Sequence, residues 1–143
     1  MTSSQNGLVF LEFIDETDAL LCYLREQQGD SSNLKVITFH PLVKIHLKKY
    51  GIDALDSFHF CLEGSHRKLV NCLQAFTDKL RETCRLEDKN GISRSYIENL
   101  IFRFRAILST WLYQVEVISN AISELKPSTV ITIGSDEALA AKS

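Results

Sequence analysis

The sequence lacks the features that most directly indicate nucleic-acid binding, membrane insertion or export. Its formal net charge is only −2 over 143 residues, so we expect no general electrostatic attraction to nucleic acid. It has no apolar run approaching the roughly 20 residues that cross a bilayer. Residues 1–7 have neither the basic region nor the apolar core of a signal peptide. These absences predict no nucleic-acid partner and no transmembrane segment.

Metal-binding patterns are missing as well. The four cysteines form no CxxC pair, and together with the four histidines they complete no zinc pattern. Cys22, Cys72 and Cys84 fall within apolar helical patterns, where free cysteines are usually buried. We therefore expect free and mostly buried thiols, no metal ion and a reducing, cytoplasmic location.

The chain also lacks a glycine-rich phosphate loop. Neither GxGxxG nor GxxxxGK[ST] occurs, and the turn after the first expected strand is acidic. Carboxylates at that turn would repel a pyrophosphate. We therefore expect no dinucleotide binding through this turn and no cofactor.

The sequence does contain alternating strand and helix patterns. Apolar runs at 7–14, 34–39 and 129–133 are typical of strands covered on both faces, and 56–62 is a weaker third strand. Helices are expected to open at 15–18 and at Pro41, and then to span about 65–86 and about 94–125. This order predicts an α/β fold, with a small parallel Rossmann-like or flavodoxin-like sheet and helices on both faces. A long helical insertion precedes the last strand.

The expected helix at 94–125 has an extended apolar pattern with three- and four-residue spacing. The stripe consists of Tyr96, Ile97, Leu100, Ile101, Phe104, Ile107, Leu108, Trp111, Leu112, Val115, Ile118, Ile122 and Leu125. Phe102 and Tyr113 widen it, so we interpret the surface as core or interface. A helix of about 30 residues spans roughly 45 Å, against a diameter of roughly 37 Å for a compact chain of this size. The helix is therefore expected to kink, to protrude or to belong to a larger body.

The C-terminal sequence reads as a helix stop at Lys126-Pro127, an apolar strand, and the first residues of another helix. We expect residues 1–143 to form a single α/β domain that is the N-terminal part of a larger protein. Such a sheet leaves an unpaired strand edge. Either a homodimer or a missing C-terminal domain is expected to cover it.

Ligands of open parallel sheets bind beyond the carboxyl ends of the strands, where the strand order reverses. The residues expected at that crevice are Asp15, Glu16, Thr17, His40, Gly134, Ser135, Asp136 and Glu137. Carboxylates and hydroxyls accept hydrogen bonds from sugar hydroxyls, so the set suits a glycan or polyol. The simpler interpretation is that residues at the starts of two helices cap them, since caps favour these residue types; these are Asp15, Thr17, Ser135, Asp136 and Glu137. For His40 the simpler interpretation is a turn residue rather than a general base.

Three local patterns resemble a known family. They are Gly51-Ile52 after the second helix, the turn Asn90-Gly91-Ile92-Ser93, and the ending Lys126-Pro127-x-x-Val130-Ile131-Thr132-Ile133-Gly134. With these patterns, residues 8–141 resemble the N-terminal domain of bacterial surface-polysaccharide glycosyltransferases of the GT-B type. The resemblance implies an acceptor-side fragment of a glycosyltransferase, inactive alone, in the cytoplasm or at the periphery of the inner membrane. The alternative is a non-catalytic α/β interaction or oligomerisation module.

Overall fold

The computed structural model describes residues 6–26, 33–87 and 94–133. The chain divides into two compact units. The first comprises Met1–Phe60 and Asn120–Ser143, and the second comprises Cys61–Ser119. We call them the α/β unit and the hairpin unit.

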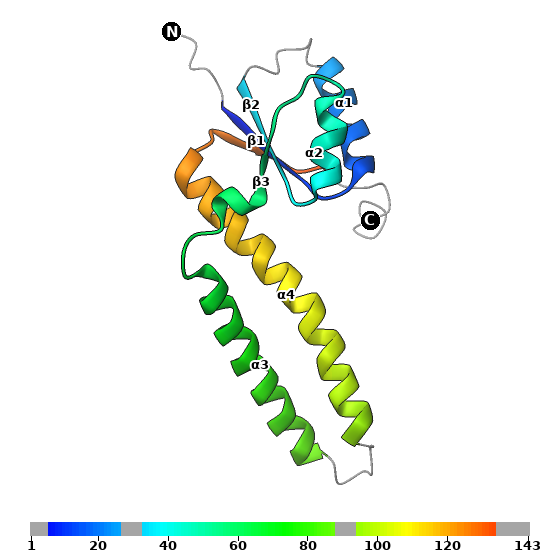
Figure 1. The fold of residues 1–143 in the computed structure, drawn as a ribbon, viewed down its shortest axis with the longest axis vertical. Coiled ribbons are helices and arrows are strands. Elements are labelled where there is room, and N and C mark those ends of the chain that lie inside the picture. The colour runs from blue at the N-terminus through cyan, green and yellow to red at the C-terminus, as the bar shows by residue number, and fades with distance from the viewer. Residues whose placement is uncertain (1–5, 27–32, 88–93, 134–143) are drawn as a thin grey trace. The chain divides into compact units, whose positions relative to one another are not determined.

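The α/β unit is built on a parallel sheet. Its described strands are β1 (Gly7–Leu11), β2 (Leu34–Thr38), β3 (Ala54–Asp56) and β4 (Thr129–Ile131), in the order β3-β2-β1-β4 (Figure 1). Every pairing between neighbouring strands is parallel. The predicted α/β class, the parallel sheet and the long helix before the last strand are therefore confirmed.

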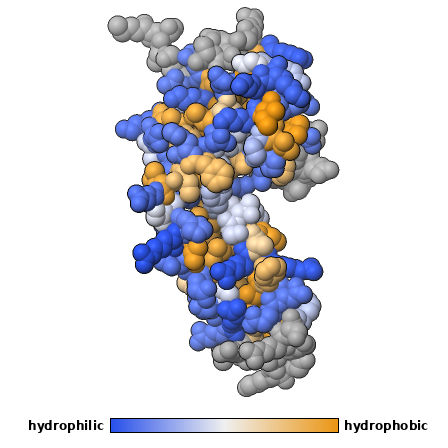
Figure 2. All heavy atoms as spheres, in the orientation of Figure 1, coloured by the Kyte–Doolittle hydropathy of each residue, from blue (hydrophilic) through white to orange (hydrophobic). Residues whose placement is uncertain are grey.

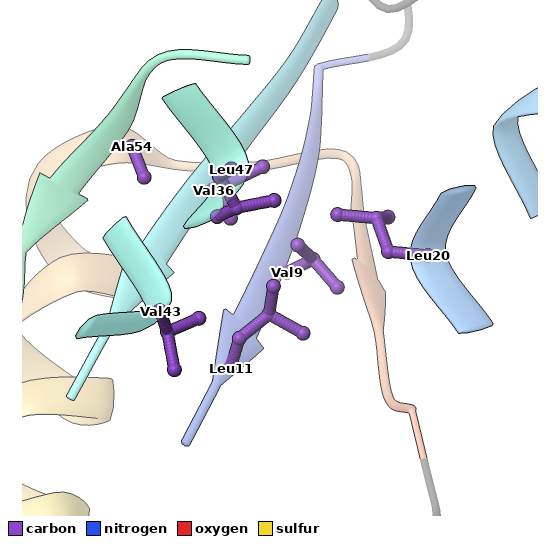
Figure 3. Close-up of a cluster of buried hydrophobic side chains, with 7 residues drawn as sticks. All are labelled: Val9, Leu11, Leu20, Val36, Val43, Leu47 and Ala54. Carbon is purple, nitrogen blue, oxygen red and sulfur yellow. The ribbon is translucent and has the colours of Figure 1, made fainter. Parts of the chain in front are cut away.

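Two helices cover one face of this sheet. They are α1 (Ile14–Glu26) and α2 (Pro41–Lys48). Figure 3 shows the buried cluster between these helices and the strands, made of Val9, Leu11, Leu20, Val36, Val43, Leu47 and Ala54. Complete burial of one such aliphatic side chain contributes about 1.5–3 kcal/mol, so this layer is the main source of stability of the unit.

The opposite face of the sheet is also covered. Side chains alternate along a strand, so Leu8 and Ile37 point away from the cluster, yet both are fully buried. The last turns of α4 (Arg94–Leu125) belong to this unit, and Ala121 within them is fully buried. Asn120 Nδ2 donates a hydrogen bond to the Phe60 carbonyl at 2.9 Å. Helices on both faces explain why β1 and β2 have almost uninterrupted apolar sequences.

The third strand was placed wrongly from the sequence. A strand was expected at 56–62, but β3 covers Ala54–Asp56 and a 3₁₀ helix follows at Ser57–Phe60. Its partner β2 ends at Thr38, which pairs with Asp56, so no backbone remains for the chain to pair with beyond that point. The buried residues of the next segment, Ser57 and Phe60, have the three-residue spacing of a 3₁₀ turn.

The hairpin unit consists of α3 (Ser65–Glu87) and most of α4, which run side by side (Figure 1). The Glu116 carboxylate accepts hydrogen bonds from Ser65 Oγ at 3.0 Å and Lys68 Nζ at 3.4 Å. Arg81 donates twice to Glu98, at 3.2 Å each. These bonds and the Glu98 charge raise the pKa of the Arg81 guanidinium. Polar links therefore join the two helices at two separate levels.

Candidate functional site

The reversal of strand order lies where it was expected, between β1 and β4. Gly7, Leu8 and Val9 pair in register with Thr129, Val130 and Ile131. The α1 connection leads from β1 to β2 on one side, whereas β4 joins on the other. Of the expected crevice residues, Gly134, Ser135, Asp136 and Glu137 lie outside the described residues.

Glu16 is used to cap its own helix. Its Oε2 accepts hydrogen bonds from the backbone N–H of Glu12 at 2.6 Å and of Phe13 at 3.0 Å. Phe13 immediately precedes α1, so this is the carboxylate half of a capping box. The same carboxylate occupies the position where an anionic ligand would meet the free N–H groups of a helix start. The turn therefore binds its own side chain.

Thr17 lies inside the α/β unit. It is fully buried in α1, and its Oγ1 has no hydrogen-bond partner. Thr38, at the end of β2, is likewise buried with an unpartnered Oγ1. An unsatisfied buried hydroxyl costs about 1–3 kcal/mol. That Thr17 binds a ligand stays a prediction.

His40 caps the second helix of the α/β unit. Its Nδ1 accepts a hydrogen bond from the Leu42 N–H at 3.2 Å, and Pro41 is the first helical residue. Asp15, in the first turn of α1, has an exposed side chain. The Phe39 N–H donates to the Leu11 carbonyl at 2.9 Å, so the ends of β1 and β2 adjoin. Among the described residues that were expected at the crevice, Asp15 is the carboxylate whose side chain is exposed to solvent.

Two partly open cavities lie elsewhere. One, of about 180 Å³, is in the α/β unit between Leu24, Leu34, Val36, Gly51, Ile52 and Asp53. Leu34 begins β2, so this cavity is at the amino ends of the strands, opposite the expected crevice. The other, of about 200 Å³, is in the hairpin unit and is lined by Thr77, Arg81, Glu98, Ile101, Phe102 and Arg105. The charged groups Arg81 and Glu98 in it are paired with each other. The Thr77 hydroxyl in the same lining donates to the Leu73 carbonyl at 2.7 Å.

The cysteines are free, as expected, but the prediction that they are mostly buried is wrong. Cys22 and Cys72 are exposed, and Cys61 and Cys84 are half-buried. Cys22 lies on α1, and Cys72 and Cys84 lie on α3, where other residues such as Leu20 and Leu73 take the buried positions. Membership of an apolar pattern therefore did not mean burial. Within the described ranges, no three His, Cys, Asp or Glu side chains are grouped to hold a metal ion. No helix in the described part of the chain is long and apolar enough to span a membrane.

A feature that sequence reasoning only partly identified is an exposed apolar surface along α4. We call it the α4 stripe. Within the hairpin unit it comprises Tyr96, Leu100, Phe104, Ile107, Trp111, Val115 and Ile118. Tyr96, Trp111 and Val115 each expose more than 60% of their surface. Their interpretation as core is therefore wrong, and their interpretation as interface remains a prediction.

The α4 stripe is separate from the seam between the two helices. Ile101, which is 3% exposed, lies in that seam, whereas Leu100 is 40% exposed. Successive helical residues are turned by about 100°, so the stripe runs beside the seam along a different side of α4. Figure 2 shows apolar residues interrupting the polar surface over the two helices. From the sequence, both sides appear as one wide apolar pattern, because periodicity does not indicate which of two apolar faces has a partner.

Comparison with known proteins identifies no relative. No family model, no curated protein and no solved structure matches this chain.

Proposed function

We propose that this chain is a non-catalytic protein-interaction module whose binding element is the hairpin unit. The observation that carries the proposal is the α4 stripe, in which six exposed large apolar side chains and the half-buried Ile118 line one side of the helix. A contiguous exposed apolar patch of this kind on a monomeric protein usually marks an interaction site.

The state of the crevice residues is consistent with this proposal. Glu16 and His40 are engaged in helix caps, and Thr17 is buried. The capping roles of Glu16 and His40 account for their presence without a ligand. The four free cysteines suit a reducing compartment such as the cytoplasm, which we propose as the location.

The test compares two matched variants of adjacent residues. Trp111→Glu places a charge on the α4 stripe, and Thr110→Glu places the same charge on an exposed position beside it. Tagged versions expressed in the source cells are sized by gel filtration of the extract. We expect the wild-type chain and Thr110→Glu to elute as a complex, and Trp111→Glu to elute near 16.2 kDa. Elution of all three at the same volume would refute the module.

The sugar-transfer hypothesis remains a second proposal. It is supported by the parallel sheet with β1 beside β4, because ligands of such sheets commonly bind beyond the carboxyl ends of the strands where the strand order reverses. The exposed side chain of Asp15, which follows β1, also supports it. In this proposal the acceptor is a glycan or polyol. NMR titration with oligosaccharides should shift the amide of Asp15. Tight binding of a nucleotide sugar at Asp15 to Thr17 would contradict it.

A further inference from the structure

The size of the α4 stripe suits one partner helix. From Tyr96 to Ile118 it extends about 33 Å at about 1.5 Å per residue. Three of its seven residues are aromatic, and aromatic side chains can each bury about 150–250 Å². At the exposed fractions observed, the side chains of the stripe together present on the order of 600 Å² of accessible surface. Residues at its rim bring this close to the roughly 800 Å² per partner of a stable complex.

The spacing within the stripe favours a straight contact. Its residues follow one another at intervals of four, four, three, four, four and three residues. The repeat is thus 11 residues over three turns, close to the natural 3.6 residues per turn of an α-helix. The stripe therefore stays on one side of α4 over its full length.

The stripe is also self-complementary when reversed. Read from its C-terminal end, the intervals are three, four, four, three, four and four, so two antiparallel copies centred on Ile107 match to within one residue. The resulting contacts are Tyr96 with Ile118, Leu100 with Val115, Phe104 with Trp111, and Ile107 with itself. The outer contacts join a larger side chain to a smaller one, which is what close packing requires. The Phe104–Trp111 contact is an aromatic pair, which contributes beyond its buried area.

The charges near the stripe permit this pairing. Arg103 is the charged residue at its rim, and in the antiparallel arrangement it lies near Thr110 and Gln114 of the other copy, both uncharged. Glu98 and Glu116 are turned toward α3 by their bonds to Arg81 and Lys68. Antiparallel pairing also opposes the dipoles of the two helices. We propose, resting on the module proposed above, that the α4 stripe binds a second copy of itself in an antiparallel, two-fold symmetric dimer.

A dilution experiment tests the partner. Sedimentation equilibrium across micromolar concentrations should show a dimer that dissociates on dilution. Trp111 is the single tryptophan of the chain, so its emission should shift to shorter wavelength together with the mass. Trp111→Glu and Ile107→Glu should each raise the dissociation constant at least tenfold. Thr110→Glu should not raise it, because its carboxylate would lie near Arg103 of the other copy. Circular dichroism checks that the variants are folded, and the two stripe variants serve as independent tests.

Spin labels test the orientation. In a background with all four cysteines changed to serine, labels are placed at Asn99→Cys or at Thr110→Cys, both exposed. In the antiparallel dimer the Asn99 labels should be roughly 10 Å farther apart than the Thr110 labels, because they lie farther from the two-fold axis. Equal separations at the two positions would overturn the antiparallel arrangement.

The other outcomes separate this inference from the proposed function. A wild-type chain that remains monomeric throughout overturns the second copy as partner. The proposed interaction module is still supported in that case if the complex found in the cell extract is lost in Trp111→Glu. A dimer that survives both stripe variants places the interface elsewhere and also overturns the inference. A monomer whose Trp111 emission shifts only on neutral or anionic phospholipid vesicles overturns both proposals, since the stripe then binds lipid.

Discussion

Glu16 determines what the first strand–helix turn can bind. Its carboxylate takes the amides of Glu12 and Phe13, which an external anion would otherwise reach. A residue that would be catalytic or ligand-binding in another protein of this architecture is here a part of the fold.

The cost of removing this cap is measurable. Glu16→Ala leaves two N–H groups without their charged acceptor, so we expect the free energy of unfolding to fall by about 1–2 kcal/mol. Asp15→Ala removes a carboxylate one residue away that acts only on the helix dipole, and it should cost about 0.5 kcal/mol. Urea unfolding of both variants measures the difference. Equal losses would show that the two hydrogen bonds to Glu16 add nothing beyond the effect of its charge.

Thr38 allows a test in which the free energy of unfolding is expected to rise rather than fall. Its buried hydroxyl has no partner, and valine has nearly the same shape. Thr38→Val should therefore raise the free energy of unfolding by about 1 kcal/mol. Thr83→Val, at an exposed helical position, is the control and should change it by less than about 0.5 kcal/mol. A loss of stability in Thr38→Val would indicate that a water molecule or ligand satisfies the hydroxyl in solution.

At the scale of elements, α4 connects the two units, and its C-terminal end is fixed by unusual backbone geometry. Lys126 follows the helix with a φ of +43°, and its N–H donates to the Ile122 carbonyl at 3.0 Å. This is a left-handed helix ending, which glycine usually supplies. The following Pro127 prevents the helix from continuing. The chain then enters β4.

This helix ending carries its own prediction. Glycine adopts positive φ without the steric penalty that a β-carbon imposes, so Lys126→Gly should stabilise the protein by about 0.5–1 kcal/mol. Lys126→Ala keeps the β-carbon and controls for loss of the charge, and it should bring no gain. Thermal unfolding of the three proteins compares them. A gain in Lys126→Ala equal to that in Lys126→Gly would assign the effect to charge.

At the scale of the whole molecule, the chain consists of two units with separate cores. Leu11 is fully buried in the cluster of the α/β unit, and Leu73 is 7% exposed in the hairpin unit. Separate cores allow local unfolding of one unit while the other persists.

Hydrogen exchange can detect this separation. Leu11→Ala should cost about 2–4 kcal/mol and speed amide exchange in β1 and β2. Exchange within α3 should change little. Leu73→Ala should show the reverse pattern. If either variant speeds exchange equally in both units, they unfold as one cooperative body.

The sequence by itself determined the order of elements and the class of fold. Strands buried on both faces require continuous apolar runs, and helices buried on one side require three- and four-residue spacing, so both patterns are readable from local sequence. The start of α2 and the end of α4 were also predictable, because Pro41 and Lys126-Pro127 act through their own backbone geometry. Of the expected site residues, Glu16 proved to be a helix cap, as the acidic start of that helix suggested, whereas the capping role of His40 was not predicted.

Only the tertiary structure decided which apolar residues are buried. The 56–62 segment has a strand pattern, but it lacks a strand to pair with beyond Thr38. Cys22 and Cys72 lie on apolar helical patterns and are nonetheless exposed. The same holds for Trp111, which belongs to a helical pattern as regular as that of the buried Ile101. Burial depends on whether another element reaches a given side of a helix, and that is a property of the packed chain, which local periodicity does not contain.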